Sequence, residues 1–500
     1  MTDFAETSAP SNPARDGADK ETPSQSSPEK PQTEALNARK QDAATPTPGA
    51  QYDSERNRLS ARIGRVANVG VNLTGAAASF GVNRVIGGDD ADARIAKALK
   101  DALGRTKGPL MKAAQLVATI PDALPPEFAK ELATLQAHAP AMGWSFVKRR
   151  MRVELGRDWE TKFQSFEREA AHAASLGQVH RAVLPDGRNV ACKLQYPDMA
   201  SAVEADLDQI KTVTGLIKRL DGSIDSSQAI AEVGERLREE LDYAREAKAM
   251  RLYQDLLSDF PQIAVPDPVE AYCTPRLLTM TWLDGEPITD YVEADQATRN
   301  TIATGLFHCF WGPMTHAGVI HGDPHLGNYA ITRAGQGLNL LDFGCIRIFP
   351  PLFVDGVVKL YRALLNDDFD ATVAAYEQWG FGNLKRELIE TLNLWARFIY
   401  GPLLDPRVRT IADGISPGEY GRKEAMNVRR LLKQHGPVTI PAEFVFMDRA
   451  AIGLGSAFLR LGAELNFHQL FEDSLDGFSE QAIADRQSAA LARADLEPTG

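Results

Sequence analysis

The sequence predicts an α+β protein with two lobes, a small β-rich lobe followed by a larger helical lobe. Short alternating segments between residues 163 and 195, bounded by turn residues, are typical of strands. After Gly285 the apolar residues recur with helical spacing, in blocks such as 295–316. Two short polar segments, at residues 321–328 and 342–344, lie within this second part. They interrupt the helical pattern and contain the side chains on which the functional prediction depends.

Composition excludes several classes of protein. The chain has 500 residues, of which 44% are hydrophobic and 24% charged, as in ordinary soluble domains, and its length suggests more than one domain. The net charge of −12 argues against a nucleic-acid partner, which usually meets a basic surface. The four cysteines form no C-x-x-C pair, so we expect reduced thiols and neither a disulfide framework nor a zinc site.

The N-terminal part of the chain begins with a polar tail and continues with a basic helical pattern. Residues 1–50 are rich in Pro, Ser, Thr and charged groups and are expected to form a disordered tail. No signal peptide and no run of roughly 18 apolar residues is present, which predicts a cytoplasmic protein. Residues 54–66 read as a basic amphipathic helix. It either packs on its own domain or lies on the inner membrane surface as a peripheral contact, and both interpretations stay open.

The segment His321-Gly-Asp-Pro-His-Leu-Gly-Asn328, followed by Asp342-Phe-Gly344, matches two motifs of protein kinases. These are H-R-D-x-x-x-x-N on the catalytic loop and D-F-G on the next turn. In that pattern Asp323 orients the attacking hydroxyl, while Asn328 and Asp342 hold Mg²⁺ against the phosphates. The two motifs in the correct order predict a kinase-type phosphate site and a bilobal protein-kinase-like fold.

A second set of motifs lies upstream, in the correct order for the same fold. Val190-Ala-Cys-Lys193 matches V-A-I-K with one change, so Lys193 is expected to contact the α- and β-phosphates. On the glycine-rich template, two glycine positions are occupied by His172 and Ala174, and Gly177 and Val179 keep the last two marked positions. Side chains at the first two positions restrict the backbone, which we expect to alter how the γ-phosphate is placed.

The partner of Lys193 should be an acidic residue on a helix. Residues 231–257 read as one long acidic helix, and an extra helix is expected between it and Lys193, at about residues 198–222. Spacing alone does not select among Glu240, Asp242 and Glu246, each of which could also be an exposed carboxylate.

Residues 277–285 read as a strand that runs into the hinge between the lobes, where Leu283 lies and adenine would bind. Met280 is the candidate gatekeeper, with a merely buried methionine as the alternative. No A-P-E follows the DFG motif, and Pro350-Pro351 leads directly into a helix. We therefore expect no long activation segment and no peptide substrate.

Taken together, these motifs resemble the UbiB/AarF family of atypical kinases over about residues 100–465. Lys112-Ala-Ala-Gln115 is similar to the family's K-x-G-Q motif with Ala114 in place of Gly, and residues 175–182 resemble its alanine-rich loop. Residues 240–242 resemble its E-x-D motif, and residues 321–328 its H-x-D-P-H-x-G-N motif. The resemblance implies that Glu246 pairs with Lys193. It also implies that Lys112 and Gln115 lie on a helical extension that folds over the active site and reaches Glu240 and Asp242.

The predicted function follows from this resemblance. It is an ATP-binding, Mg²⁺-dependent atypical kinase or ATPase that supports ubiquinone or lipid metabolism, with ATP or ADP as nucleotide and a lipid or quinone precursor as a further partner. Two alternatives remain. H-G-D-x-x-x-x-N also marks small-molecule phosphotransferases of the aminoglycoside- and choline-kinase type, and a pseudokinase could act as a nucleotide-gated scaffold.

The predictions divide the chain into five parts. These are a tail (1–50), a helical extension with the K-x-x-Q motif (51–160), a kinase-like N-lobe with inserted helices (161–284), a helical C-lobe (285–482) and a flexible tail (483–500). The candidate catalytic residues are Asp323, Lys193 and Glu246, and the candidate metal ligands are Asn328 and Asp342. The candidate nucleotide contacts are Lys193, Ala174, Ser175, Gly177, Val179, Met280 and Leu283.

Overall fold

The computed structural model describes residues 141–497, except 174–175, 221–233, 236, 333–334, 382–383, 413–420 and 436–440. The predicted tail at residues 1–50 and the extension up to residue 140, with Lys112 and Gln115, therefore lie outside the described residues. Ala174 and Ser175 also lie outside them.

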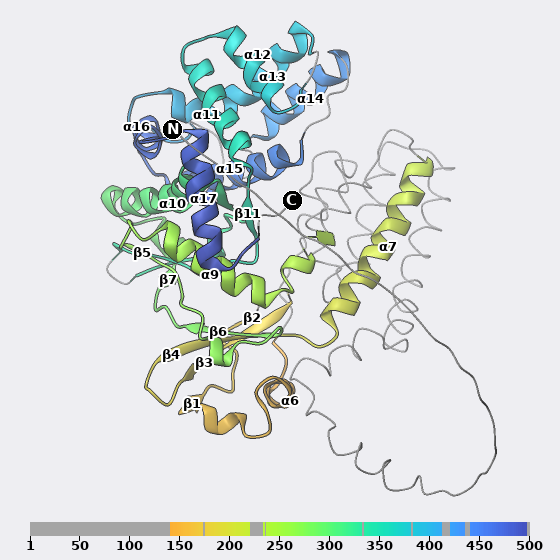
Figure 1. The fold of residues 1–500 in the computed structure, drawn as a ribbon, viewed down its shortest axis with the longest axis vertical. Coiled ribbons are helices and arrows are strands. Elements are labelled where there is room, and N and C mark those ends of the chain that lie inside the picture. The colour runs from red at the N-terminus through yellow and green to blue at the C-terminus, as the bar shows by residue number, and fades with distance from the viewer. Residues whose placement is uncertain are drawn as a thin grey trace, which may run out of the picture. The chain divides into compact units, whose positions relative to one another are not determined.

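A five-stranded antiparallel sheet forms the small lobe (Figure 1). Its order is β1-β3-β4-β6, and β2 pairs with the other part of β3. Strands β3 and β4 form the predicted hairpin, whose turn contains Gly187 with φ +87°. The strands are β1 (Ser165–Phe166), β2 (His172–Ala173), β3 (Gly177–Val183), β4 (Asn189–Gln195) and β6 (Leu277–Thr281).

One face of this sheet packs against helices that precede it in the chain, and the other face belongs to the core of the helical lobe. Val190, Cys192 and Leu194 of β4 form one core with helix α6 (Trp144–Leu155) and the 3₁₀ helix η2 (Trp159–Lys162). The predicted boundary of the small lobe at residue 161 is therefore wrong. Helix α6 precedes it, yet Val147 and Met151 are fully buried in this core because side chains four positions apart lie on one face of a helix.

Among the described residues between β4 and β6 are two long helices, as the sequence predicts for an inserted segment. They are α7 (Met199–Leu220) and α9 (Tyr243–Leu256). The prediction of one continuous helix up to residue 257 is wrong, because Glu240 and Leu241 form a turn. Asp242 then begins α9, and its side chain accepts the backbone N–H of Arg245 at 2.9 Å. An Asp at this position satisfies a free N–H of the new helix, which favours a break over continuation.

Two further small sheets support the polar loops. One has the order β5-β10-β9-β7, and the other pairs β8 with β11 antiparallel, with His321 opposite Ile346. The strands are β5 (Ile263–Ala264), β7 (Glu286–Pro287), β8 (Val319–His321), β9 (Tyr329–Ile331), β10 (Leu338–Leu340) and β11 (Ile346–Ile348).

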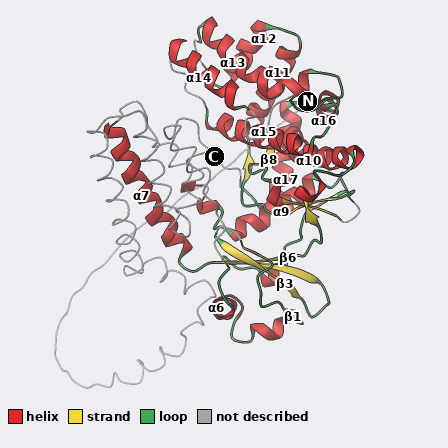
Figure 2. Ribbon diagram, turned by 180° about the vertical axis from the view of Figure 1, so that it is seen from behind, coloured by secondary structure: helices red, strands yellow, loops and turns green. Residues whose placement is uncertain are grey.

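The helical lobe has a core that extends to α9 and to one face of the small-lobe sheet. In Figure 2 its helices gather at the end of the molecule opposite to β1, β3 and β6. The α-helices are α10 (Gln296–Ala317), α11 (Pro351–Leu365), α12 (Phe369–Gln378), α13 (Arg386–Tyr400), α14 (Arg422–His435), α15 (Ala442–Leu461), α16 (Phe467–Ser474) and α17 (Glu480–Ala494). The remaining 3₁₀ turns are η3 (Glu270–Tyr272), η4 (Ile288–Tyr291), η5 (Leu326–Asn328) and η6 (Gly401–Leu404).

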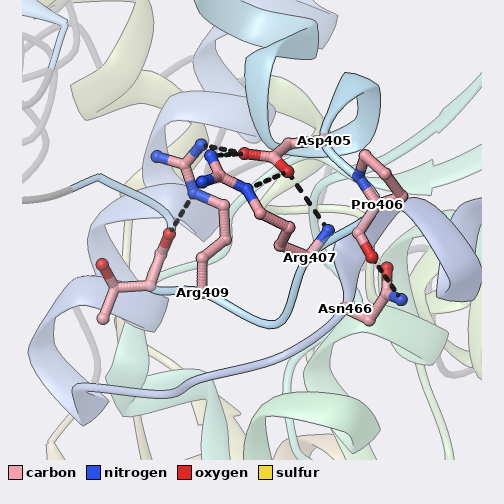
Figure 3. Close-up of polar contacts among 6 residues, drawn as sticks. Asp405, Pro406, Arg407, Arg409 and Asn466 are labelled. Atoms are coloured by element: carbon pink, nitrogen blue, oxygen red, sulfur yellow. Dashed lines mark hydrogen bonds and ion pairs between the residues drawn. The ribbon is translucent and has the colours of Figure 1, made fainter.

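The loop after η6 is fastened by the carboxylate of Asp405 (Figure 3). It accepts hydrogen bonds from the guanidinium groups of Arg407 (2.8 and 2.6 Å) and Arg409 (2.9 Å). These bonds hold the pKa of Asp405 below its usual value, Arg407 contributing most. Asn466 donates to the carbonyl of Pro406 at 2.9 Å, which ties the loop to the start of α16.

The prediction of a flexible tail over residues 483–500 is wrong for most of that segment. Residues 480–494 form α17, whose side chains of Ile483, Ala490 and Leu491 are buried in the main core. The Ala-rich composition favours a helix, and its few apolar residues recur on a single face. Within the described part of the chain, no helix is long and apolar enough to cross a membrane.

Candidate active site

Lys193 of β4 is held between two carboxylates. Its ammonium Nζ lies 2.6 Å from Oε1 of Glu246 on α9 and 3.8 Å from Oδ2 of Asp342 in the DFG segment. The side chain of Glu246 is only 1% exposed and that of Lys193 12%, whereas that of Asp342 is 46% exposed. The structure therefore pairs Lys193 with Glu246 and turns the more accessible acid, Asp342, toward the same cation.

This surrounding charge fixes the protonation state of Lys193. Burial alone would lower the pKa of the ammonium group. The carboxylates of Asp342 and Glu246 outweigh this effect and raise the pKa above its ordinary value. Lys193 is thus a permanent cation at neutral pH, which is the state that a phosphate-binding lysine requires.

Tyr243 is a site residue that the sequence reasoning missed. Lys193 Nζ lies 5.3 Å from the centroid of its ring, within the range of a cation–π contact. The Tyr243 hydroxyl also lies close to Gly177, where an added Cβ would come within 2.9 Å of it and within 2.4 Å of the Leu194 carbonyl. Gly177 therefore has a packing reason to be glycine. The available signal for Tyr243 was its place directly after Asp242, at the start of a helix.

His321 joins the catalytic loop to the DFG segment. Its Nε2 lies 2.6 Å from the backbone carbonyl of Asp342, and its Nδ1 accepts the backbone N–H of Asp323 at 3.3 Å. The neutral imidazole with its proton on Nε2 satisfies both contacts. Its ring lies against Phe343, which in turn contacts Tyr253 of α9. His321 therefore sets the backbone positions of both acidic residues.

Asn328 holds the other end of the loop. Its Nδ2 donates to the backbone carbonyl of Asp323 at 2.9 Å and lies 3.3 Å from Asp323 Oδ2. The backbone carbonyl of Asn328 accepts the N–H of Leu341 at 2.9 Å, next to Asp342. Asp342 Oδ1 accepts the N–H of Gly344 at 2.9 Å. The candidate catalytic and metal residues that the sequence selects are thus neighbours in space.

Two glycines permit close contacts around this loop. Gly322 donates its N–H to the Cys345 carbonyl at 2.7 Å, and a Cβ on Gly322 would lie 2.9 Å from that oxygen. On helix α15, a Cβ on Gly453 would lie 2.5 Å from the ring of Pro324. The catalytic loop is therefore packed directly against the chain after DFG on one side and against α15 on the other.

Arg347, which the sequence reasoning also missed, links the E-x-D turn to the strand after DFG. Its guanidinium lies 2.6 Å from the carboxylate of Glu239 and 4.9 Å from the ring of Phe446 on α15. The backbone of Arg347 is paired with Ile320, next to the catalytic loop. A basic residue three positions after Gly344 was visible in the sequence, but its acidic partner is more than 100 residues away.

The donor set fits a magnesium ion better than a softer metal. Asp342 and Asn328 present carboxylate and amide oxygens, the ligands that Mg²⁺ prefers. Within the described residues, no group of three or more His, Cys, Asp or Glu could enclose a metal ion. Mg²⁺ usually keeps several waters and shares substrate phosphates, so one carboxylate and one amide suffice as protein ligands.

The other predicted residues occupy less decisive positions. Met280 is buried opposite Ala191 in the small-lobe sheet, Val179 is half-buried opposite Lys193, and Leu283 is half-buried after β6. In the E-x-D turn, Asp242 caps α9, and Glu240 Cα lies 3.9 Å from the position of a Cβ on Gly344. The turn therefore borders the DFG segment.

Comparison with known proteins agrees with this architecture. Residues 134–376 match the family model of the ABC1 atypical kinase-like domain. The mitochondrial atypical kinase COQ8 of Saccharomyces cerevisiae is 30% identical over 308 residues, which are 60% of each chain. The mitochondrial atypical kinase coq-8 of Caenorhabditis elegans is 26% identical over 389 residues, 75% of this chain and 50% of that protein. The structure of the Rv3197–erythromycin complex from Mycobacterium tuberculosis is 26% identical with a TM-score of 0.52, over 74% of this chain and 93% of that chain.

The fold and the motifs define a bilobal, kinase-like protein. More narrowly, residues 134–376 match the ABC1 atypical kinase-like domain, in agreement with the predicted resemblance to the UbiB/AarF family of atypical kinases. The matched regions span between half and about three fifths of the length of these COQ8 relatives.

Proposed function

We propose that this protein is an ATP-binding, Mg²⁺-dependent atypical kinase or ATPase. The observation that carries the proposal is the placement of Lys193, which is paired with buried Glu246 and lies 3.8 Å from the more exposed Asp342. A lysine held in this way presents its charge to phosphate oxygens without needing to reorganise.

Each side chain has a role that its contacts support. Glu246 orients Lys193, which binds the α- and β-phosphates. Asp323, fixed by Asn328 and His321, orients the hydroxyl or water that attacks. Asn328 and Asp342 would hold Mg²⁺, which when bound neutralises the charge of the phosphates.

The substrate class follows from the family resemblance. We propose a small lipid or quinone precursor as acceptor or activator, in support of ubiquinone or lipid metabolism, and no peptide acceptor. The short connection from β11 to α11 supports the last point, because only Phe349 and Pro350 separate these elements. Peptide substrates of kinases dock on a longer segment at this place.

The metal assignment can be tested with Asp342→Asn in the full chain. Nucleotide affinity in the presence of Mg²⁺ should fall at least about 10-fold, because a ligating carboxylate becomes a neutral amide. The exposed Asp370→Asn on α12 serves as a matched control and should bind as wild type does. Equal Mg²⁺-dependent binding by the Asp342 variant and wild type would refute the assignment.

Turnover and acceptor are tested together by measuring ATP hydrolysis with and without anionic vesicles and phenolic quinone-precursor mimics. An increase with either addition supports the proposed substrate class.

A second variant, Lys112→Ala, tests the extension that lies outside the described residues. This variant should have a changed nucleotide preference or autophosphorylation. Behaviour identical to wild type would refute a role for the extension at the active site.

A further inference from the structure

Helix α17 packs against α9, α10 and α11, and in Figure 1 its lower end lies at α9. Its buried positions recur every three or four residues, which gives the helix one continuous buried face. The face comprises Ile483, Gln487, Ala490, Leu491 and Ala494, all less than 9% exposed. The same core contains Tyr253 of α9 and Phe343 of the DFG segment.

Two ion pairs fasten the C-terminal end of α17 to α9. The guanidinium of Arg493 contacts both carboxylate oxygens of Asp255, at 3.1 and 2.5 Å. Lys248 lies 2.6 Å from Asp495, and it follows Glu246 by only two residues. Exposed pairs of this kind contribute little to stability, but these two contact α9 at points seven residues apart and so define where the C-terminal end of α17 lies on α9.

Helix α17 also contacts the ends of β8 and β11, the strands next to the catalytic loop and the DFG segment. Buried Gln487 donates through Nε2 to the carbonyls of Ala317 and Phe349, both at 2.8 Å. Ala317 ends α10 just before β8, and Phe349 follows β11. Gly318 lies between these contacts with φ +67°, and a Cβ there would come within 2.8 Å of the Gln487 amide. Gln487 thus bridges the ends of the two strands that carry His321 and follow Asp342.

We propose that α17 is a brace that positions α9 relative to β8 and β11, and so holds Glu246 in reach of Lys193 and Asp342. This inference rests on the proposed function, because it gives the brace a role in nucleotide chemistry. Glu246 precedes His321 by 75 residues in the sequence, so its position relative to the catalytic loop depends on how α9 packs. Because α17 contacts both α9 and the ends of β8 and β11, it fixes the position of α9 relative to these two strands. Arg493, Gln487 and Leu491 are then positioning residues.

The first experiment compares Leu491→Ala with Leu388→Ala in the full chain. Both remove a buried leucine, but Leu388 lies on α13, outside the core that α9 and α17 share. Each variant is studied by hydrogen exchange under conditions where its global stability matches the other's. For Leu491→Ala, exchange of the α9 amides should rise at least about 10-fold above that of Leu388→Ala, because the packing of α9 is loosened locally.

Equal α9 exchange in these two variants would overturn the brace. This readout does not require turnover, so it separates failure of the brace from failure of the proposed function. Where wild type hydrolyses ATP, kcat should fall more for Leu491→Ala than for Leu388→Ala while both retain their fold. An equal fall in kcat would show that α17 has no positioning effect on chemistry.

A charge exchange tests the register without removing packing. Arg493→Asp or Asp255→Arg alone places like charges together and should raise α9 exchange by about two- to threefold. The double variant restores an opposite pair and should return exchange toward wild type. Failure of the double variant to rescue would contradict the proposed register.

Discussion

Two cation–carboxylate pairs flank the DFG segment, and they differ in how fully protein groups surround the cation. Arg347 lies between Glu239 and the ring of Phe446, so its planar guanidinium is enclosed by protein groups. Lys193 is paired with Glu246 yet also lies near the more exposed Asp342.

The difference separates a binding cation from a positioning cation. A lysine is a compact charge whose three N–H groups can turn toward a new partner, whereas an arginine fork fixes the geometry of the partners that it already has. We therefore expect Lys193 to act on nucleotide directly and Arg347 to act through the E-x-D turn.

The largest effect is expected for Lys193→Met. Loss of the charge next to Asp342 and Glu246 should lower ATP turnover by about 100-fold or more, as removal of a preorganised electrostatic contact does. Steady-state ATP hydrolysis measures this. Lys359→Met, which removes an exposed lysine of α11 from its pair with Asp355, is the control and should retain activity. Full activity of Lys193→Met would place phosphate binding elsewhere.

A smaller effect is expected at Arg347. Arg347→Lys keeps the charge but loses the planar fork, and Glu239→Gln keeps the shape but loses the charge. Each should lower kcat by about three- to tenfold, and the two together should cost less than the product of the single effects because they share one interaction. Multiplicative losses would show that the Arg347–Glu239 contact is not what connects them to turnover.

A third expected effect is on stability and not on turnover, and it concerns a carboxyl whose hydrogen-bond donor is a neutral indole. Asp448 of α15 accepts the Trp395 N–H at 2.6 Å, and burial raises its pKa to about 7 from 3.8. The folded state therefore holds a proton that the unfolded chain releases between about pH 4 and 7. The free energy of unfolding should fall as pH rises through this window, by up to about 4 kcal/mol.

Denaturant unfolding at pH 5 and pH 8 checks this expectation. Asp448→Asn keeps an acceptor for Trp395 and carries no titrating group, so its unfolding free energy should change less between the two pH values than that of wild type. A pH dependence identical to wild type would assign the titration to another group.

The local motifs carried most of what could be predicted. The loop from His321 to Asn328, the DFG segment and the Lys193 strand are each a short continuous segment. The chemistry of phosphate transfer sets the spacing of the functional residues within them. Glu246 required the family resemblance, because three carboxylates on one predicted helix are equivalent in spacing. The break at Asp242 explains why they are not equivalent in space, since Glu246 lies in the first turn of a new helix.

The remaining features depend on tertiary contacts. Helix α17 has six Ala among its 15 residues and few large apolar ones, and its buried face becomes evident only once α9, α10 and α11 supply a surface to cover it. Arg347 and Glu239 are distant in sequence and meet because the E-x-D turn borders the DFG segment. Helix α6 precedes the predicted small lobe and completes its core through Val147 and Met151.

Gly322 has a consequence for how the segment after DFG is held in place. It occupies the place of the arginine in H-R-D, and its backbone touches the Cys345 carbonyl, so a long side chain there would displace the segment after DFG. In protein kinases, arginines that bind a phosphorylated residue order the activation segment and so report an upstream signal. Gly322 provides no such receiver at this position. In this protein the segment after DFG is held instead by the backbone hydrogen bond from Gly322 to Cys345 and by the pairing of β11 with β8.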